Sequence, residues 1–583
     1  MERASNINSL WAALLVEELV RLAVDTFCVA PGSRSTPLTV AVARHQRVSS
    51  SVHYDERGAA FHALGYARAT GKAAAVITTS GTALANVWPA VVEASLDRVP
   101  LIVLSGDRPP ELQDTGANQT IDQVKLFGEY VRWSVTLPCP DTAIAPAVLL
   151  TTVDQAEYRA TGAEPGPVHM NCMFREPLAP TEQVGDFGIY LEALAHWRTS
   201  ERPYTAYHRA AAPICEAALG ELSTLANEHE NGLLVVGHLT QGAERELLAQ
   251  LAARLNWPLL PDITSGMRLG GGGSTVVPNY DTLLASTGFT AAHRPDIVIH
   301  VGGRVTSKVL LDYLELAAPR HHVVVTDAPG RQDPLHATTL RLDMPIDAFG
   351  EQLLPLIRNR LKSTWLASWQ ASAGPVQRRM RALFGSGLTL TEPLVAWLVS
   401  HHIDPDHGLF LASSMPVRDM DAFADSERGF LPVEANRGAS GIDGTIASAA
   451  GFARGLKRPV TLLIGDLAFL HDLNSLSLVR HLAVPLVIVL LNNNGGGIFS
   501  FLPISQQTAV FESYFGTPHG IRFEAAAGLF GLDYAHPESA DAFVENYQSA
   551  LRASVSTLVE VTTERAENVR IHRWLRESVL EDG

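Results

Sequence analysis

The chain has 583 residues, which is more than one hydrophobic core usually organises, so we expect about three domains of roughly 150 to 200 residues. Lys and Arg number 45 against 61 Asp and Glu, and the resulting net charge of −16 argues against general binding to nucleic acids or anionic membranes. The four cysteines are scattered without metal-site spacing, which is typical of reduced thiols in a cytoplasmic protein.

The N-terminal segment predicts an amphipathic helix and not a signal peptide. It has no basic region ahead of an apolar core, and it carries Glu17 and Glu18. The longest apolar run, residues 482–491, is too short to cross a bilayer and is interrupted by Pro485. We therefore expect a cytoplasmic protein without a membrane span.

Strand-like and helix-like segments alternate in three blocks, which predicts an α/β fold of mostly parallel sheets flanked by helices. The expected domains are residues 1–180, 208–365 and 388–583, with junctions at 177–207 and 365–387. The predicted strands are 27–30, 52–54, 75–78 and 101–104; then 233–236, 297–300 and 322–325; then 460–464, 486–491 and 558–561.

Polar residues follow two neighbouring strands of the third block. Asp466 comes after strand 460–464, a helix is expected over 471–481, and Asn493 comes after strand 486–491. A right-handed crossover would bring both strand ends to one edge of a parallel sheet. Ordinary loop chemistry explains either piece alone. Together, in this order, the two pieces indicate hard oxygen ligands of the kind Mg²⁺ prefers.

This arrangement resembles the diphosphate-and-metal motif of thiamine diphosphate enzymes, although the third motif position, usually glycine, is Leu467 here. The resemblance implies thiamine diphosphate with Mg²⁺ or Mn²⁺, and a metal held by Asp466, Asn493 and Gly495. The further cofactor contacts that it implies are Glu56, Pro31, Thr79, Ser414, Ile442, Gly465, Leu467, Ala468, Gly496 and Ile498.

Glu56 is the predicted catalytic residue. It follows strand 52–54 and opens a helix, which places it at the carboxyl edge of a sheet, although an acidic first-turn residue also simply complements the helix dipole. Thiamine chemistry needs a carboxylate on the pyrimidine ring nitrogen, because the resulting imino tautomer takes the proton from the thiazolium C2. By resemblance, Ile442 supports the bent cofactor; simple core packing is its alternative.

Basic residues recur at strand ends and in turn-rich loops. They are Arg34, Arg108, Lys308, Arg418 and Arg437. Each one alone would be a solvated surface group, but together, in an acidic chain, they suggest a site for substrates with several carboxylates.

Several segments together resemble the 2-succinyl-5-enolpyruvyl-6-hydroxy-3-cyclohexene-1-carboxylate synthases of menaquinone (or phylloquinone) biosynthesis: PGSRSTPLT, DERGAAFHALG, TTSGTALANVWPA, GDRPPEL, GANQTIDQ, GPVHMNC, NRGASGIDG and NNNGGGIFSFLP. That family implies decarboxylation of 2-oxoglutarate on thiamine diphosphate and addition of the succinyl-semialdehyde carbanion to isochorismate. It also implies a homodimer or homotetramer with active sites at the subunit interface.

The same resemblance assigns substrate contacts. Ser33, Arg34, Arg108, Asn118 and Gln119 would line the isochorismate side. Lys308, Ser414, Arg418 and Arg437 would hold carboxylates, and Ile498, Phe499 and Leu502 would form an apolar wall. Val309 stands where relatives often have a basic residue.

Two alternatives remain open at this point. The first is another thiamine diphosphate decarboxylase or carboligase, such as an acetolactate-synthase-like enzyme acting on pyruvate, whose small acceptor would not need so many cations. The second is a non-catalytic α/β nucleotide-binding protein that keeps the scaffold.

Overall fold

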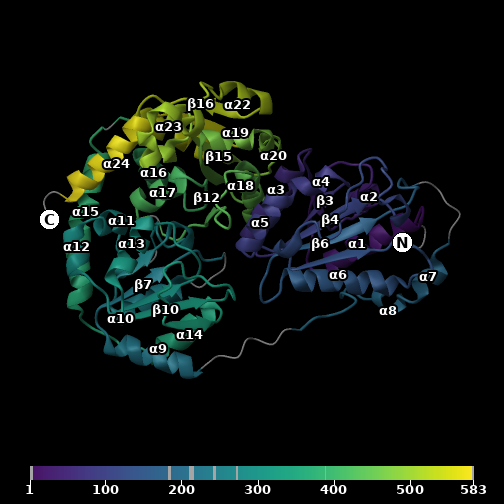
Figure 1. The fold of residues 1–583 in the computed structure, drawn as a ribbon, viewed down its shortest axis with the longest axis horizontal. Helices are drawn as coiled ribbons and strands as arrows, with labels where there is room; N and C mark the ends of the chain where they lie inside the picture. The colour runs from purple at the N-terminus through teal and green to yellow at the C-terminus, as the bar shows by residue number, and fades with distance from the viewer. Residues whose placement is uncertain are drawn as a thin grey trace. The chain divides into compact units, whose positions relative to one another are not determined.

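Three sheets form the framework of the chain in the computed structural model, which describes residues 4–180, 186–208, 216–240, 245–270, 273–387, 389–427 and 429–580 (Figure 1). The strand pairings within these residues are parallel, so the predicted α/β class with parallel sheets is confirmed. Leu388, where the third domain was expected to begin, and Cys215 lie outside the described residues. Cys28, Cys139 and Cys172 are buried free thiols.

The first sheet contains β1 (Thr26–Val29), β2 (Ser49–Val52), β3 (Ala74–Thr78), β4 (Leu101–Asp107), β5 (Trp133–Leu137) and β6 (Pro167–Met173), in the order β2-β1-β3-β4-β6-β5. The predicted strand at 52–54 overlaps β2 only at Val52, because β2 begins three residues earlier and ends two residues earlier. β2 is an edge strand whose serines are mostly exposed, so it lacks the apolar run that marks the inner strands.

Helices cover both faces of this sheet. Phe27 and Ile77 join a core with α1 (Ile7–Arg21), α2 (Thr36–Arg44) and α6 (Pro146–Ala160). α3 (Glu56–Thr70) contacts β1 and β3. The further α-helices described before position 209 are α4 (Thr82–Asn86), α5 (Trp88–Leu96), α7 (Gly188–Glu192) and α8 (Ala195–Arg198).

The second sheet contains β7 (Gly232–Val236), β8 (Leu259–Pro261), β9 (Ile297–Val301), β10 (His321–Thr326) and β11 (Leu340–Asp343), in the order β11-β10-β9-β7-β8. Its helices are α9 (Glu216–Glu228), α10 (Arg245–Leu255), α11 (Tyr280–Leu284), α12 (Thr287–Ala292), α13 (Lys308–Ala317) and α14 (Ile346–Leu353).

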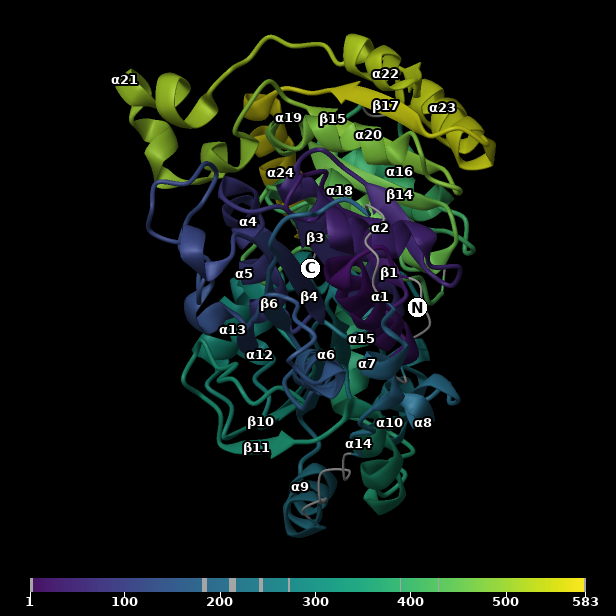
Figure 2. The same ribbon diagram turned by 90° about the vertical axis from the view of Figure 1, so that its right-hand side faces the viewer.

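The third sheet contains β12 (Gly408–Leu411), β13 (Val433–Ala435), β14 (Val460–Gly465), β15 (Leu486–Asn492), β16 (Asp533–Ala535) and β17 (Thr557–Thr562), in the order β13-β12-β14-β15-β17-β16. Its helices are α16 (Glu392–His402), α17 (Met415–Phe423), α21 (Thr508–Phe511), α22 (Glu524–Phe530), α23 (Ala540–Arg552) and α24 (Arg565–Leu580). Figure 2 shows α23 beside β17, which it contacts.

The predicted helix over 471–481 was wrong. The segment forms α19 (Asp466–His471), a 3-10 turn (Leu473–Ser475) and α20 (Leu476–Val479). The break falls at Asp472, whose carboxylate accepts hydrogen bonds from Ala447 N at 2.9 Å and from Ser475 Oγ at 2.8 Å. A buried side chain that is held in this way competes with the helical backbone pattern.

The chain divides into two compact units, each of which combines distant segments. The first consists of Met1–Ala210, Asn436–Lys457 and His471–Val484; the second consists of Ala211–Ala435, Arg458–Leu470 and Pro485–Gly583. In the first unit α18 (Thr445–Leu456) packs against α3. Because these units combine distant segments, they do not test the domain boundaries predicted from the sequence, which stay a prediction.

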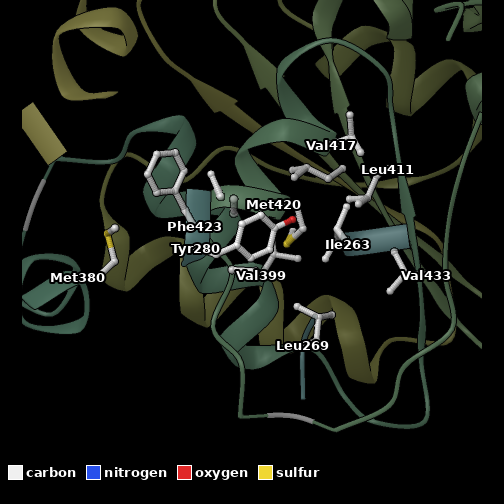
Figure 3. Close-up of a cluster of buried hydrophobic side chains, with 14 of the residues drawn as sticks. Ile263, Leu269, Tyr280, Met380, Val399, Leu411, Val417, Met420, Phe423 and Val433 are labelled. Atoms are coloured by element: carbon white, nitrogen blue, oxygen red, sulfur yellow. The ribbon is translucent and has the colours of Figure 1, made fainter. Parts of the chain in front are cut away.

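The second unit holds the second and third sheets on one shared core. Tyr280 lies among Ile263, Val399 and Met420 in Figure 3, and the same cluster extends to residues of both sheets. The expected junction at 365–387 is mostly the helix α15 (Thr364–Phe384), which buries Trp365 and Trp369 in this core. Among the described residues, no helix is both long and apolar enough to cross a membrane.

Candidate active site

The ends of β14 and β15 bring Asp466 and the asparagine loop together, which confirms the predicted adjacency. The two strands pair in parallel, with Gly465 opposite Leu491. Asp466 is only 2% exposed, and its Oδ2 accepts the backbone N–H of Gly495 at 2.9 Å. Its Oδ1 accepts the N–H of Leu467 at 2.7 Å. The carboxylate is thereby fixed at the carboxyl edge of the third sheet, where ligands of α/β proteins bind.

The Asn493 side chain is held in one orientation by Glu392. Asn493 Nδ2 donates to Glu392 Oε1 at 2.9 Å, and Glu392 also accepts from Thr563 Oγ1 at 3.0 Å. Asn493 Oδ1 is buried and has no hydrogen-bond donor among the described residues. A buried acceptor without a donor is costly, so this oxygen is suited to a cation.

Glu392 was missed by the sequence analysis. It begins α16 after the N-cap Thr391, a position at which an acidic residue looks like ordinary helix capping. In the structure it is 1% exposed, and burial together with the charge of Asp419 raises its pKa to about 8. Only the fold shows that this acid contacts Asn493.

His519 is a second neighbour that the sequence analysis missed. Its Nε2 lies 3.2 Å from Asp466 Oδ2. Asn494 Oδ1 accepts the N–H groups of His519 at 2.9 Å and Gly520 at 2.7 Å, so this segment is fixed to the asparagine loop. Burial raises the pKa of Asp466, whereas the hydrogen bonds from Gly495 and His519 oppose that rise.

The glycines of the motif meet steric needs. Gly495 has a φ of +134°, and a Cβ there would lie 1.8 Å from the carbonyl oxygen of Gly516. A Cβ at Gly465 would meet nothing within 4 Å, so open space lies beside the end of β14. Ala468 and Gly496 are buried, whereas Leu467, Ile498 and Phe499 are half-buried and Leu502 is exposed.

The donor set fits a hard divalent cation. The described residues contain no cluster of three or more His, Cys, Asp or Glu side chains that could hold a metal. An ion at this edge would therefore depend on the Asp466 carboxylate, Asn493 Oδ1 and a backbone carbonyl such as that of Gly495. These are oxygen donors, and Mg²⁺ takes a few of them and keeps its other positions for water and phosphate.

Glu56 is the first residue of α3, as predicted. The N-cap Asp55 accepts from Arg57 N at 2.9 Å and from Asn474 Nδ2 at 2.6 Å, which secures the first turn. Glu56 itself is half-buried, and its carboxylate forms no hydrogen bond or ion pair with the described residues. The carboxylate is therefore available to a ligand. Nearby His53 is buried, which lowers its pKa.

The loops after β1 and β3 touch at the carboxyl edge of the first sheet. A Cβ at Gly32 would lie 2.2 Å from Thr79 Cβ, and Arg34 N donates to Thr79 Oγ1 at 3.2 Å. Arg108 donates to Ser80 Oγ, and Gln119 Nε2 donates to Ser80 O at 3.0 Å. Pro31 and Ser33 are exposed in the loop after β1, and Asn118 is exposed in the segment between β4 and β5.

Arg34 and Arg108 make this edge a cationic site. Arg34 is 9% exposed; it donates to Phe174 O at 2.9 Å, and its Nη2 lies 3.5 Å from Glu176 Oε1. Burial lowers the pKa of Arg34, and the positive charge of Arg108 lowers it further. Two neighbouring guanidinium groups of this kind favour an anionic ligand.

The other predicted cations lie in different surroundings. The Lys308 side chain is 83% exposed, and its Nζ lies 2.6 Å from Asp312 Oδ1. Arg418 is exposed on α17 and donates to the carbonyl of Ser414, the N-cap with a φ of +75°. Arg437 and Ile442 are half-buried in the loop between β13 and α18.

The predicted residues are thus distributed over the two units. The first unit contains Pro31, Ser33, Arg34, Glu56, Thr79, Arg108, Asn118, Gln119, Arg437 and Ile442. The second contains Lys308, Ser414, Arg418, Gly465, Asp466, Leu467, Ala468, Asn493, Gly495, Gly496, Ile498, Phe499 and Leu502. A separate cavity of about 440 Å³ lies at the second sheet, lined by His300, His322 and Arg331 among others, and it contains none of these residues.

Comparison with known families agrees with this geometry. Residues 11–126 match the family described as thiamine pyrophosphate enzyme, N-terminal TPP binding domain. Residues 188–411 match the middle domain of thiamine pyrophosphate, and residues 420–561 match thiamine pyrophosphate enzyme, C-terminal TPP binding domain. The chain is therefore a thiamine pyrophosphate enzyme.

Full-length relatives define the family more closely. A 2-succinyl-5-enolpyruvyl-6-hydroxy-3-cyclohexene-1-carboxylate synthase of Rubrobacter xylanophilus is 51% identical over 97% of this chain and 98% of its own length. The synthase of Salinibacter ruber is 47% identical over 100% of this chain and 98% of its own. The chain belongs to this synthase family.

A solved structure shares the fold. The thiamine diphosphate-dependent 4-hydroxybenzoylformate decarboxylase of Rhodococcus jostii RHA1 superposes with a TM-score of 0.70, over 95% of this chain and 99% of the other. Its sequence identity is 18%, so this similarity concerns the fold alone.

Proposed function

We propose that the chain releases carbon dioxide from 2-oxoglutarate and joins the remaining four-carbon unit to isochorismate. The product is 2-succinyl-5-enolpyruvyl-6-hydroxy-3-cyclohexene-1-carboxylate, an intermediate of menaquinone or phylloquinone biosynthesis. The observation that carries the proposal is the 51% identity to such a synthase over nearly the whole chain, with Glu56, Asp466 and Asn493 all present. The enzyme would work in the cytoplasm.

The third sheet would hold the diphosphate end of the cofactor. Asp466, Asn493 Oδ1 and the Gly495 carbonyl would bind Mg²⁺ or Mn²⁺, and the ion would offset the negative charge of the diphosphate. The buried oxygen of Asn493 that lacks a donor supports this assignment. The space beside Gly465 would admit the phosphates. Leu467, Ala468, Gly496 and Ile498 would also contact the cofactor, because they lie within the two strand-end motifs.

Glu56 would control the tautomeric state of the bound pyrimidine ring. Its carboxyl group would form a hydrogen bond with the ring nitrogen, as donor when protonated and as acceptor when ionised. The absence of any other partner for this group among the described residues supports such a contact. When bound, thiamine diphosphate supplies the carbon nucleophile for decarboxylation and carbon–carbon bond formation. Ile442 would support its bent form, with Pro31, Thr79 and Ser414 as further contacts.

The cations would select dicarboxylate substrates. Arg34 and Arg108, which are close enough for their charges to interact, would bind isochorismate together with Ser33, Asn118 and Gln119. Lys308, Ser414, Arg418 and Arg437 would hold carboxylates, chiefly those of 2-oxoglutarate, and Ile498, Phe499 and Leu502 would exclude water. A homodimer or homotetramer would complete the active site, with Glu56 and Asp466 of one site contributed by different chains.

A direct assay tests the proposal. Purified protein is mixed with thiamine diphosphate, Mg²⁺, 2-oxoglutarate and isochorismate, and carbon dioxide and the coupled product are followed by mass spectrometry. We expect release of both, and none without the cofactor. Parallel reactions replace 2-oxoglutarate with pyruvate; a preference for pyruvate would favour the acetolactate-synthase-like alternative and overturn the substrate assignment.

A further inference from the structure

A buried carboxylate outside the recognised motifs holds the loop that carries Arg437 and Ile442. Glu93, near the end of α5, is 2% exposed. Its Oε1 accepts the N–H of Gly438 at 2.8 Å, and its Oε2 accepts the N–H of Ala439 at 2.6 Å. Both carboxylate oxygens therefore bind consecutive amides of a loop that is 345 residues away in the sequence.

Arg68 supplies the counter-charge. Its Nη2 lies 2.7 Å from Glu93 Oε1, and the side chains of both residues are at most 3% exposed. Asp97 is a second carboxylate bound to Arg68. Burial raises the pKa of Glu93, and the charge of Arg68 opposes that rise. Charge-assisted hydrogen bonds to backbone amides are stronger than neutral ones, particularly away from water.

The loop fits closely against α5. A Cβ at Gly438 would lie 2.5 Å from the carbonyl oxygen of Glu93, so only glycine permits this approach. Ser440 adopts a φ of +58°, a left-handed conformation that a non-glycine residue keeps only when its surroundings enforce it. A cavity of about 180 Å³ lies beside the contact, lined by Ala439, Gly441 and Asp443 among others, and it gives the loop space to move if the anchor is lost.

We propose that Glu93 is a positioning residue of the substrate site: by binding the amides of Gly438 and Ala439 it fixes the preceding Arg437, and with it the substrate carboxylate. Arg437 is assigned to a carboxylate of 2-oxoglutarate only under the proposed function, on which this inference rests. Glu93 touches neither substrate nor cofactor in this scheme; it acts through the loop.

The experiment compares Glu93→Gln with Glu18→Gln. The glutamine places an amide N–H₂ against a loop amide that needs an acceptor. Glu18 is the matched control, because it is also a buried carboxylate of the first unit that accepts N–H donors, from Trp197 and Tyr204, but it lies on α1. Hydrogen exchange of a peptide covering residues 436–444 and steady-state kinetics are measured for both variants and for the unmodified protein.

We expect faster exchange in residues 436–444 for Glu93→Gln alone. We also expect a KM for 2-oxoglutarate raised about tenfold or more, the scale of one charged hydrogen bond, with kcat changed less than about threefold. Unchanged exchange, or changed exchange with an unchanged KM, overturns the positioning role. So does an equal rise of KM in Glu18→Gln.

Two further arms keep the result decisive. If Glu93→Gln does not fold, Gly438→Ala displaces the loop from its own side of the same contact and must raise the KM similarly; an unchanged KM then overturns the proposal. If the unmodified protein does not turn over 2-oxoglutarate, the proposed function has failed. The exchange measurement still decides whether Glu93 anchors the loop.

Discussion

Replacement of Glu392 by leucine tests whether this residue sets the orientation of the Asn493 carboxamide. Leucine has a similar size but cannot accept the hydrogen bond that Asn493 Nδ2 donates at 2.9 Å. The amide group would then be buried without an acceptor, or the carboxamide would turn and present its N–H₂ group to the proposed metal. The loss of such a buried hydrogen bond costs about 1–3 kcal/mol, so we expect Mn²⁺ affinity to fall about 5- to 150-fold.

Electron paramagnetic resonance of Mn²⁺, titrated in the presence of thiamine diphosphate, measures the effect directly. Glu392→Gln is the matched control, because its carbonyl oxygen can still accept from Asn493, and burial already raises the pKa of Glu392 to about 8. We expect that control to bind Mn²⁺ within about threefold of the unmodified protein, as it keeps the hydrogen bond. Normal Mn²⁺ affinity in Glu392→Leu, or an equal loss in both variants, would refute the reasoning.

Glu56→Gln should retain thiamine diphosphate in calorimetry but lose about 10²- to 10⁴-fold in turnover, the scale of a positioned proton-transfer group; near-normal turnover would contradict this role. Asp466→Ala should release the cofactor on gel filtration in Mg²⁺ buffer, because the proposed metal would lose the one charged ligand among those assigned to it; full retention would exclude that role. Burial lowers the pKa of His62 from 6.5 to about 3, so the unfolded chain binds a proton that the folded chain does not as the pH falls below 6.5. Urea unfolding should therefore show stability falling between pH 7 and pH 5, with a contribution from His62 of about 2 kcal/mol that is absent in His62→Gln; an equal pH dependence in that variant would contradict it.

In the third sheet, the local sequence pattern was enough to predict which strand ends lie together. Asp466 and Asn493 each follow an apolar strand, and the crossover rule for parallel strands predicted that these ends would meet. The structure agrees, since Gly495 donates to Asp466. The apolar pattern that located the strands of the third sheet was less accurate for the bounds of β2 in the first sheet. β2 is an exposed edge strand of serines, so it carries little apolar signal.

The sequence by itself determined the alternation of strands and helices, the two strand-end motifs, the position of Glu56 at the start of α3 and the family of the chain. These features are encoded locally, in hydrophobic periodicity, glycines and short polar signatures. Tertiary structure alone decided that Glu392, 101 residues away, orients Asn493, that His519 approaches Asp466, and that Glu93 binds the loop of Gly438. The physical reason is that a buried carboxylate gains its partners only when the folded chain excludes water around it, and no spacing along the chain records which distant amide will be there.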